Sequence, residues 1–173
     1  MISLSDFIED LPWQGKPLPS IKVPENSIHG VTITPLQHNR DPRGSLVVLK
    51  NATTDGDPDP IVFVYRVTAE PGAIRAWVFH KRQDDRLAFT DGQFRIVLYD
   101  LRPDSPTFGQ INVIDAGQDN PLRLRIPIHV VHGVQNRGAR ASFVNMPTRA
   151  YDPANPDKSR VDYPDPRIPY QFD

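Results

Sequence analysis

Proline is the feature that most limits what this chain can fold into. The 173 residues include 19 prolines, which cluster at 12–24, 58–60 and 147–169, about twice the usual share of roughly 5%. Proline lacks a backbone N–H and disrupts helix interiors, and in sheets it is confined to edges and bulges. We therefore expect no long helices, and we expect the proline clusters to be loops or extended arms laid over a surface.

The rest of the sequence falls into short apolar and β-branched runs separated by turn sequences. This pattern is typical of an all-β sandwich or barrel. Asp91-Gly92 predicts a hairpin turn, and Ser3–Leu11 predicts one or two helical turns with Ser3 or Ser5 as the N-cap. The predicted strands are Val31–Leu36, Leu46–Leu49, Ile61–Thr68, Ile74–Phe79, Arg86–Phe89, Phe94–Leu101, Gln110–Ile114, Leu122–Ile126, Val130–Val134 and Ala141–Asn145.

Length and composition bound the class of protein. A chain of this size suits one domain, which we divide into an N-terminal arm (1–28), a barrel (29–147) and a C-terminal arm (148–173). We expect the second arm to be ordered, because isolated aromatic residues in its polar sequence can anchor it. They are Tyr151, Tyr163, Tyr170 and Phe172.

Several classes of function are disfavoured. The absence of Cys excludes disulfides, thiolate metal sites and a Cys nucleophile, and the start of the sequence has no signal-peptide pattern. Formal net charge is -1, with basic residues scattered, which argues against nucleic-acid binding. No apolar run approaches the roughly 20 residues of a membrane span. We expect a cytoplasmic protein with no membrane partner.

Two segments, 72–92 and 127–136, carry the candidate chemistry. They resemble the two sequence motifs of the cupin barrel. In that pattern a Gly precedes two ligand positions two residues apart, an acidic position and a second Gly; the later segment supplies a Pro, a fourth ligand position and an Asn. The four ligand positions in this chain are Val78, His80, Asp85 and His132.

Further stretches make the resemblance more specific. Asp41–Gly44, Tyr99–Gly109, the Ile74-Arg75 pair and 127–133 make the chain similar to the dTDP-4-dehydrorhamnose 3,5-epimerase family of cupins, from about residue 29 to residue 172. The resemblance implies a jelly-roll barrel, a homodimer that exchanges N-terminal strands, no metal or other cofactor, and a nucleotide-diphospho-4-keto-6-deoxy sugar as substrate. The implied reaction inverts carbons next to the ketone.

That reaction needs a base, donors for the enolate oxygen and an acid on the opposite face. Three of the positions that the family uses are replaced here. The family's base His corresponds to Val78, its Lys to Asp85 and its Tyr to Asn145. The catalytic half of the site is therefore expected to differ from the family pattern.

The remaining positions agree with the family. By resemblance, Arg75 and Arg43 contact the diphosphate and nucleotide, His132 is the second His, and Asp165 is the carboxylate that supports the base. Tyr65 is a further candidate for substrate contact, together with Asn145 at the Tyr position. In an unbroken strand Arg75 would face away from Val78, so its role requires a bulge or a strong twist.

His80 is the candidate replacement for the missing base. It lies two residues beyond Val78, so both side chains should face into the barrel. The first hypothesis is an epimerase or isomerase with His80 as base, Asp165 or another carboxylate orienting it, and His132 near the oxyanion. The simpler alternative is that His80 is a hydrogen-bonded barrel histidine without a catalytic role.

Two other functions remain open. Two histidines and a carboxylate form a common ligand set for iron, so His80, Asp85 and His132 could hold a divalent transition metal in a metal-dependent cupin. Asp85 could instead be a rim carboxylate paired with Arg82 or Arg86. Loss of three catalytic positions would also fit a non-catalytic sugar-nucleotide binder.

Overall fold

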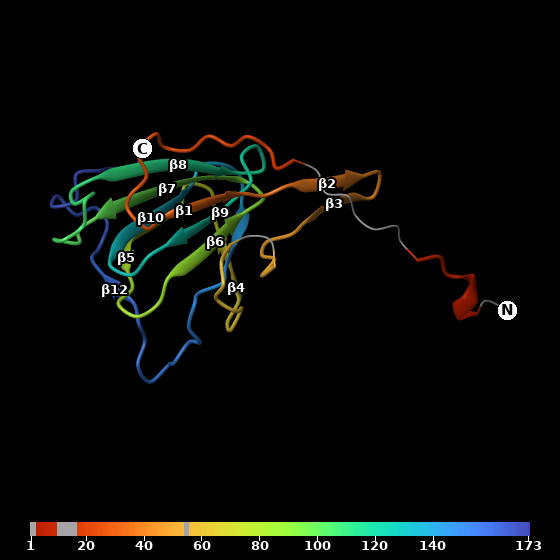
Figure 1. Ribbon diagram of the computed structural model, residues 1–173. Coiled ribbons are helices and arrows are strands. Elements are labelled where there is room, and N and C mark those ends of the chain that lie inside the picture. The colour runs from red at the N-terminus through yellow and green to blue at the C-terminus, as the bar shows by residue number, and fades with distance from the viewer. Residues whose placement is uncertain (1–2, 10–16, 54–55) are drawn as a thin grey trace.

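The protein is an all-β jelly roll, as expected from the short runs and turns. The computed structural model describes residues 3–9, 17–53 and 56–173. One five-stranded antiparallel sheet has the order β1-β9-β6-β11-β4, and a second has the order β12-β5-β10-β7-β8. The two sheets face each other, and a two-stranded hairpin, β2-β3, projects from them (Figure 1).

The strands are short. Their bounds are β1 (Thr32–Pro35), β2 (His38–Asp41), β3 (Gly44–Val47), β4 (Tyr65–Ala69), β5 (Ile74–Phe79), β6 (Asp85–Phe89), β7 (Gln93–Asp100), β8 (Ile111–Gly117), β9 (Leu122–Ile126), β10 (Val130–Asn136), β11 (Ala141–Asn145) and β12 (Ser159–Arg160).

Two expectations about local structure were wrong. Asp91-Gly92 does not close a hairpin, because β6 and β7 belong to different sheets; the turn carries the chain across the sandwich. The run 61–68 forms a strand only from Tyr65 onward. The expected N-terminal helical turn is present as a single 3-10 turn, Leu4–Asp6, with Ser3 as its N-cap; residues 10 and 11 of its expected range lie outside the described residues.

An apolar core fills one end of the space between the sheets. Phe89 and Phe143 lie 4.9 Å apart between ring centroids, and Phe94 contacts both. Burial of such rings is the main favourable term in folding. The other end of the sandwich is not filled by this core and holds polar side chains.

The C-terminal arm is ordered and packs on the outer face of β5. Trp77 is 1% exposed and stacks on Phe172, with ring centroids 5.3 Å apart. Tyr163 and Tyr170 pack around the same pair. The expected anchoring by aromatic residues is therefore confirmed for these three. Tyr151 is 60% exposed, and its ring stacks on Phe63 with centroids 6.2 Å apart.

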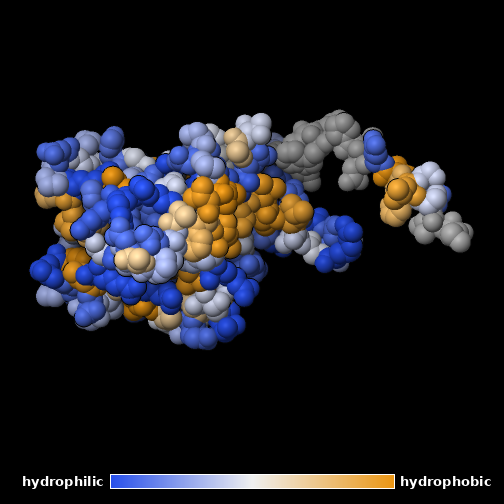
Figure 2. All heavy atoms as spheres, turned by 90° about the horizontal axis from the view of Figure 1, so that it is seen from below, coloured by the Kyte–Doolittle hydropathy of each residue, from blue (hydrophilic) through white to orange (hydrophobic). Residues whose placement is uncertain are grey.

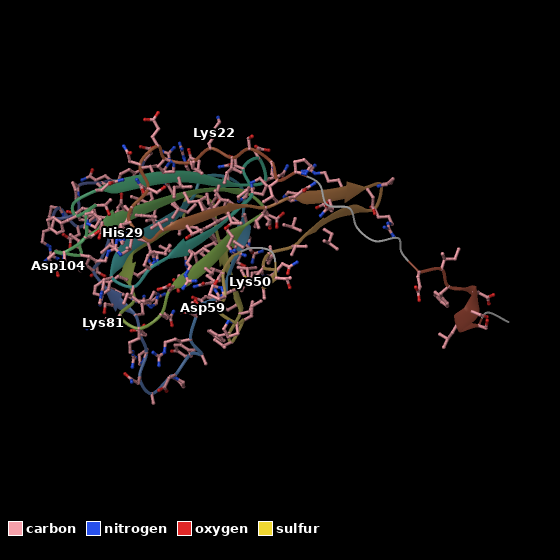
Figure 3. All side chains as sticks on the ribbon, viewed as in Figure 1. Lys22, His29, Lys50, Asp59, Lys81 and Asp104 are labelled. Atoms are coloured by element: carbon pink, nitrogen blue, oxygen red, sulfur yellow. The ribbon has the colours of Figure 1, made fainter. Side chains whose placement is uncertain are left out.

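A buried ionic network fixes the segment before β4 to the barrel. The guanidinium of Arg86 is fully buried; it contacts Asp57 at 3.1 Å and donates to the carbonyl oxygens of Asp59 and Pro60. Lys50 and Asp59 lie beside β6 in Figure 3 and extend this network. Within the described ranges, no helix is long and apolar enough to cross a membrane.

Candidate active site

A cavity of about 410 Å³ opens at the polar end of the barrel. Side chains from β4, β5, β6, β10 and β11 form its walls, and the C-terminal arm forms its mouth. The polar lining residues are Tyr65, Arg75, Asp85, His132, Asn145, Lys158, Arg160 and Asp162. Titratable groups from separate strands therefore converge on one enclosed space, which is typical of a ligand site.

A wider hollow of about 700 Å³ lies on the outer surface. It is lined mainly by the proline-rich loop 101–106 together with Phe79, Ile128 and Val131. It contains no buried cluster of titratable groups among the described residues. The smaller barrel cavity is therefore the better candidate for chemistry.

A β-bulge brings Arg75 into the cavity. His132 pairs with Val78, and Val134 pairs with Arg75, so between these pairs two residues of β5 lie opposite one residue of β10. The extra residue reverses the alternation of side chains. Arg75 consequently faces the same side as Val78, which supplies the irregularity that its predicted role required.

Gly133 makes this bulge possible. A Cβ on Gly133 would lie 2.6 Å from the Cβ of Ala76 and 3.1 Å from the ring of Trp77. Only a residue without a side chain allows β10 to approach β5 this closely. The cavity wall thus depends on one glycine in the second sequence segment.

His80, Asp85 and His132 form a buried cluster beside the cavity. Oδ2 of Asp85 lies 3.3 Å from Nε2 of His80 and 3.5 Å from Nε2 of His132. All three residues are at most 6% exposed. Asp85 is therefore no rim carboxylate, and the two arginines proposed for it pair elsewhere, Arg82 with Asp157 and Arg86 with Asp57.

Main-chain carbonyls orient both imidazoles. Nδ1 of His132 donates to the carbonyl oxygen of Val130 at 3.2 Å, and Nδ1 of His80 donates to that of Asp157. A carbonyl only accepts, so each Nδ1 carries the proton and each Nε2 is left to face Asp85. The contact from His80 Nε2 lies at ion-pair distance but lacks hydrogen-bond geometry.

Asp85 and His80 shift each other's pKa in opposite directions. Burial raises the pKa of Asp85, but the adjacent imidazoles of His132 and His80 outweigh this effect and hold that pKa well below its usual value. Burial lowers the pKa of His80, and the Asp85 carboxylate outweighs this effect, so the net shift is upward. An ionised Asp85 between two imidazoles is the state that this arrangement favours.

His132, rather than His80, is the imidazole that lines the cavity. His80 lies at the end of β5, just before Lys81, which is labelled in the loop between β5 and β6 in Figure 3. Its ring centroid is 6.0 Å from that of His132. The candidate base from the sequence therefore lies beside Asp85 and not among the residues that line the cavity.

Tyr65 and Asn145 lie together in the opposite wall. They are register partners on β4 and β11, and Nδ2 of Asn145 donates to the Tyr65 hydroxyl at 2.8 Å. Burial, followed by the negative charge of Asp85, raises the pKa of Tyr65. A neutral phenol therefore lies next to the residue at the family's Tyr position.

Lys158 and Arg160 are cavity residues that the sequence reasoning missed. Desolvation and the charge of Arg160 lower the pKa of Lys158, against the opposing charge of Asp85. Both residues flank or belong to β12, a two-residue strand that pairs with Val78 and Phe79. A two-residue strand leaves no periodic pattern in the sequence. The one available signal was the spacing of Lys158 and Arg160, which are two residues apart.

Two predicted site residues lie outside the cavity. The Asp165 carboxylate is held by Arg167 at 2.5 and 2.9 Å and lines a separate hollow behind β5. It also accepts a hydrogen bond from the backbone N–H of Arg167, within a proline-flanked turn. The carboxylate that lies beside His80 is instead that of Asp85. Arg43 lies at the tip of the β2-β3 hairpin, where its side chain is 89% exposed and paired with Asp41.

Comparison with known proteins identifies the family. The sequence model of the dTDP-4-dehydrorhamnose 3,5-epimerase family matches residues 25–173. The chain belongs to this family. It is 37% identical over 140 residues to the probable low-salt glycan biosynthesis epimerase Agl13 of Haloferax volcanii, an alignment that covers 79% of this chain and 89% of that protein. The family resemblance inferred from the sequence is thus confirmed.

Solved structures of the family share the fold. A dTDP sugar isomerase from Desulfovibrio desulfuricans G20 superposes with a TM-score of 0.77 at 24% identity, covering 83% of this chain and 91% of the other. An epimerase from Legionella pneumophila, solved with dTDP-4-keto-L-rhamnose, gives a TM-score of 0.73 at 22% identity and covers 88% and 84%. These comparisons confirm the jelly-roll barrel.

Proposed function

We propose that this family member is an isomerase that epimerises a nucleotide-diphospho-4-keto-6-deoxy sugar by removing a proton next to the ketone. Family membership supports the class of substrate. The observation that carries the proposal is the cavity itself, because an imidazole, a phenol and several cations face one enclosed space. Those are the groups that enolisation of a ketone requires.

In this proposal each catalytic role is filled by a residue other than the one at the family's position for that role. His132 is the base in this proposal, since its Nδ1 is held by the carbonyl of Val130 and only Nε2 can take a proton. Asp85 lies beside this nitrogen and stabilises the imidazolium that forms when His132 takes a proton, and His80 holds Asp85 from the other side. His132 therefore takes the part that the family gives to the position of Val78.

Lys158 and Tyr65 complete the set. Lys158 is coupled by charge to Asp85, which stands at the family's Lys position, so its ammonium can stabilise the enolate oxygen. Tyr65 contacts Asn145, which stands at the family's Tyr position. Its phenol can return a proton to the face opposite the base.

Cations at the cavity mouth suit the diphosphate. Arg75 and Arg160 both line the opening, and guanidinium groups bind phosphate oxygens in pairs. Arg43 lies on the projecting hairpin and would reach a diphosphate only in the cavity of a second copy. We propose a homodimer in which this exchange occurs.

An apolar face beside the hairpin supports such a dimer. Figure 2 shows apolar side chains gathered next to the base of the projection. Exposed large apolar residues in the hairpin and before β4 are Leu46, Val48, Ile61, Val62 and Val64. Exposed apolar patches commonly mark interfaces. A role in carbohydrate biosynthesis and a cytoplasmic location are part of the same proposal.

Deuterium exchange tests the function directly. The protein is incubated in D₂O with a thymidine-diphospho-4-keto-6-deoxy sugar, and proton NMR follows the carbons next to the ketone. We expect deuterium to enter at one or both carbons. His132→Gln should slow the exchange by about 10²–10⁴-fold, whereas Tyr151→Phe, a change on the exposed surface, should leave it unaltered.

Binding of the same sugar nucleotide is measured in parallel by calorimetry. No exchange in the presence of intact binding would refute the enzymatic proposal and would indicate a sugar-nucleotide binder. Exchange that is unaffected by His132→Gln would refute the assignment of the base.

A further inference from the structure

We propose that His80, Asp85 and His132 form a binding site for one divalent first-row transition-metal ion. The proposal concerns a ligand of the barrel cluster and does not rest on the proposed epimerase activity. It follows from four features of the cluster: the spacing of the donor atoms, their orientation, the unsatisfied nitrogen of His80 and the apolar residue opposite His132.

The spacing of the donors fits coordination. One donor atom from each residue lies within 4.8 Å of the other two, and the two nitrogen-to-oxygen distances are 3.3 and 3.5 Å. Metal–nitrogen and metal–oxygen bonds of roughly 2.1 Å at tetrahedral angles place neighbouring donors about 3.4 Å apart. An ion can therefore enter with small side-chain rotations.

The orientation of the imidazoles also fits. Each Nδ1 donates to a main-chain carbonyl, that of Val130 or of Asp157, so each Nε2 points toward the Asp85 carboxylate. Histidine ligands in metal sites are held in this way, because a hydrogen bond at one nitrogen fixes the lone pair at the other. Asp157 is itself fixed, since its carboxylate accepts from the backbone N–H groups of Lys81 and Arg82.

Nε2 of His80 is buried without a hydrogen-bond partner. Its residue is only 6% exposed, and leaving a buried polar atom unsatisfied is unfavourable. A cation between the three side chains would satisfy this nitrogen, the second imidazole and the carboxylate together. The cluster has the composition of a binding site rather than of an apolar core.

Two imidazoles and one carboxylate favour a transition metal over magnesium or calcium, which prefer oxygen ligands. Val78 faces His132 across the strand pair and offers no donor atom. An ion held by three side chains would therefore keep a coordination position for water or for a ligand in the cavity. Because metal and proton compete for Nε2 of His132, the metal-bound form and the metal-free base are two alternative states of one site.

Metal titration tests the site without a substrate. Protein treated with a chelator is titrated with Co²⁺, followed by visible absorption, and with Zn²⁺, followed by calorimetry. We expect saturation at one equivalent. His80→Gln and Asp85→Asn should each weaken binding by more than the roughly 10–100-fold that loss of a supporting hydrogen bond costs. His29→Gln is the matched control, because His29 is exposed and is not one of the three clustered residues.

Thermal unfolding of the metal-free variants checks that they fold. If a variant does not fold, NMR of the imidazole nitrogens in the wild-type protein is used in place of that variant. Zn²⁺ should then shift the Nε2 resonances of two histidines and leave those of the remaining three unchanged. Lack of saturable binding would overturn the proposal. Binding retained in both variants would overturn it equally, since it would place the metal elsewhere.

Discussion

Gly133→Ala tests whether the bulge shapes the cavity. The added Cβ would lie 2.6 Å from the Cβ of Ala76, whereas carbon atoms in contact are normally about 3.5–4.0 Å apart. The two strands must therefore separate by about 1 Å, or the bulge must rearrange. Overpacking of this kind costs roughly 1–3 kcal/mol. For a domain of this size the loss corresponds to a fall in Tm of about 2–12 °C.

A second substitution isolates the cause. Ala76→Gly removes the Cβ that the new methyl group would strike, and alone it should cost about 0.5–1 kcal/mol. In the double variant Gly133→Ala/Ala76→Gly the loss should be smaller than the sum of the two single losses. The contact with the Trp77 ring at 3.1 Å would remain, so recovery should be incomplete.

Thermal and urea unfolding measure these differences, and calorimetry with a thymidine diphosphate measures binding. Because the bulge turns Arg75 into the cavity, Gly133→Ala should also weaken nucleotide binding. Gly138→Ala is the control, since its nearest neighbour would lie at an ordinary 3.4 Å. The reasoning would be refuted if Gly133→Ala unfolded like the wild type, or if the two substitutions were simply additive.

Two further predictions concern the buried network around Asp57. Arg86→Met should lower the free energy of unfolding by about 3–5 kcal/mol, because Asp57 loses one of its cationic partners and several buried carbonyl oxygens lose their donor; urea titration measures this, and Arg82→Met, whose side chain is 42% exposed, should change it little. Burial raises the pKa of Asp57, but its hydrogen bonds with Arg86 and Asp59 bring it below the ordinary 3.8. The resulting stability is therefore present above about pH 4 and is lost as the pH falls through the lowered pKa. Urea midpoints measured between about pH 6 and pH 2.5 should show this loss, and Asp57→Asn should reduce it; an unchanged pH dependence would contradict the assignment.

The sequence predicted the fold because the signals for it are local. Short β-branched runs and turn residues are sufficient to indicate an all-β barrel. Asp91-Gly92 shows the limit of local reading, since the dipeptide fixes a tight turn but not which sheet each flanking strand joins. That choice depends on partners far along the chain, such as β9 and β10.

The part of the candidate site that lies on the barrel strands was predicted from the sequence. Tyr65, Arg75, His132 and Asn145 all line the cavity, although regular strand alternation alone would have turned Arg75 outward. Lys158 was missed because its position depends on how the C-terminal arm crosses the barrel.

Part of the cavity belongs to the arm rather than to the barrel. The arm supplies Lys158 and Arg160 to the mouth and the carbonyl of Asp157 to His80, and it is held by the packing of Phe172 on Trp77. The residues that complete the site are therefore synthesised after the barrel strands. A nascent chain could close its sandwich before it can bind, and changes in the arm could retune ligand preference while the barrel stays intact.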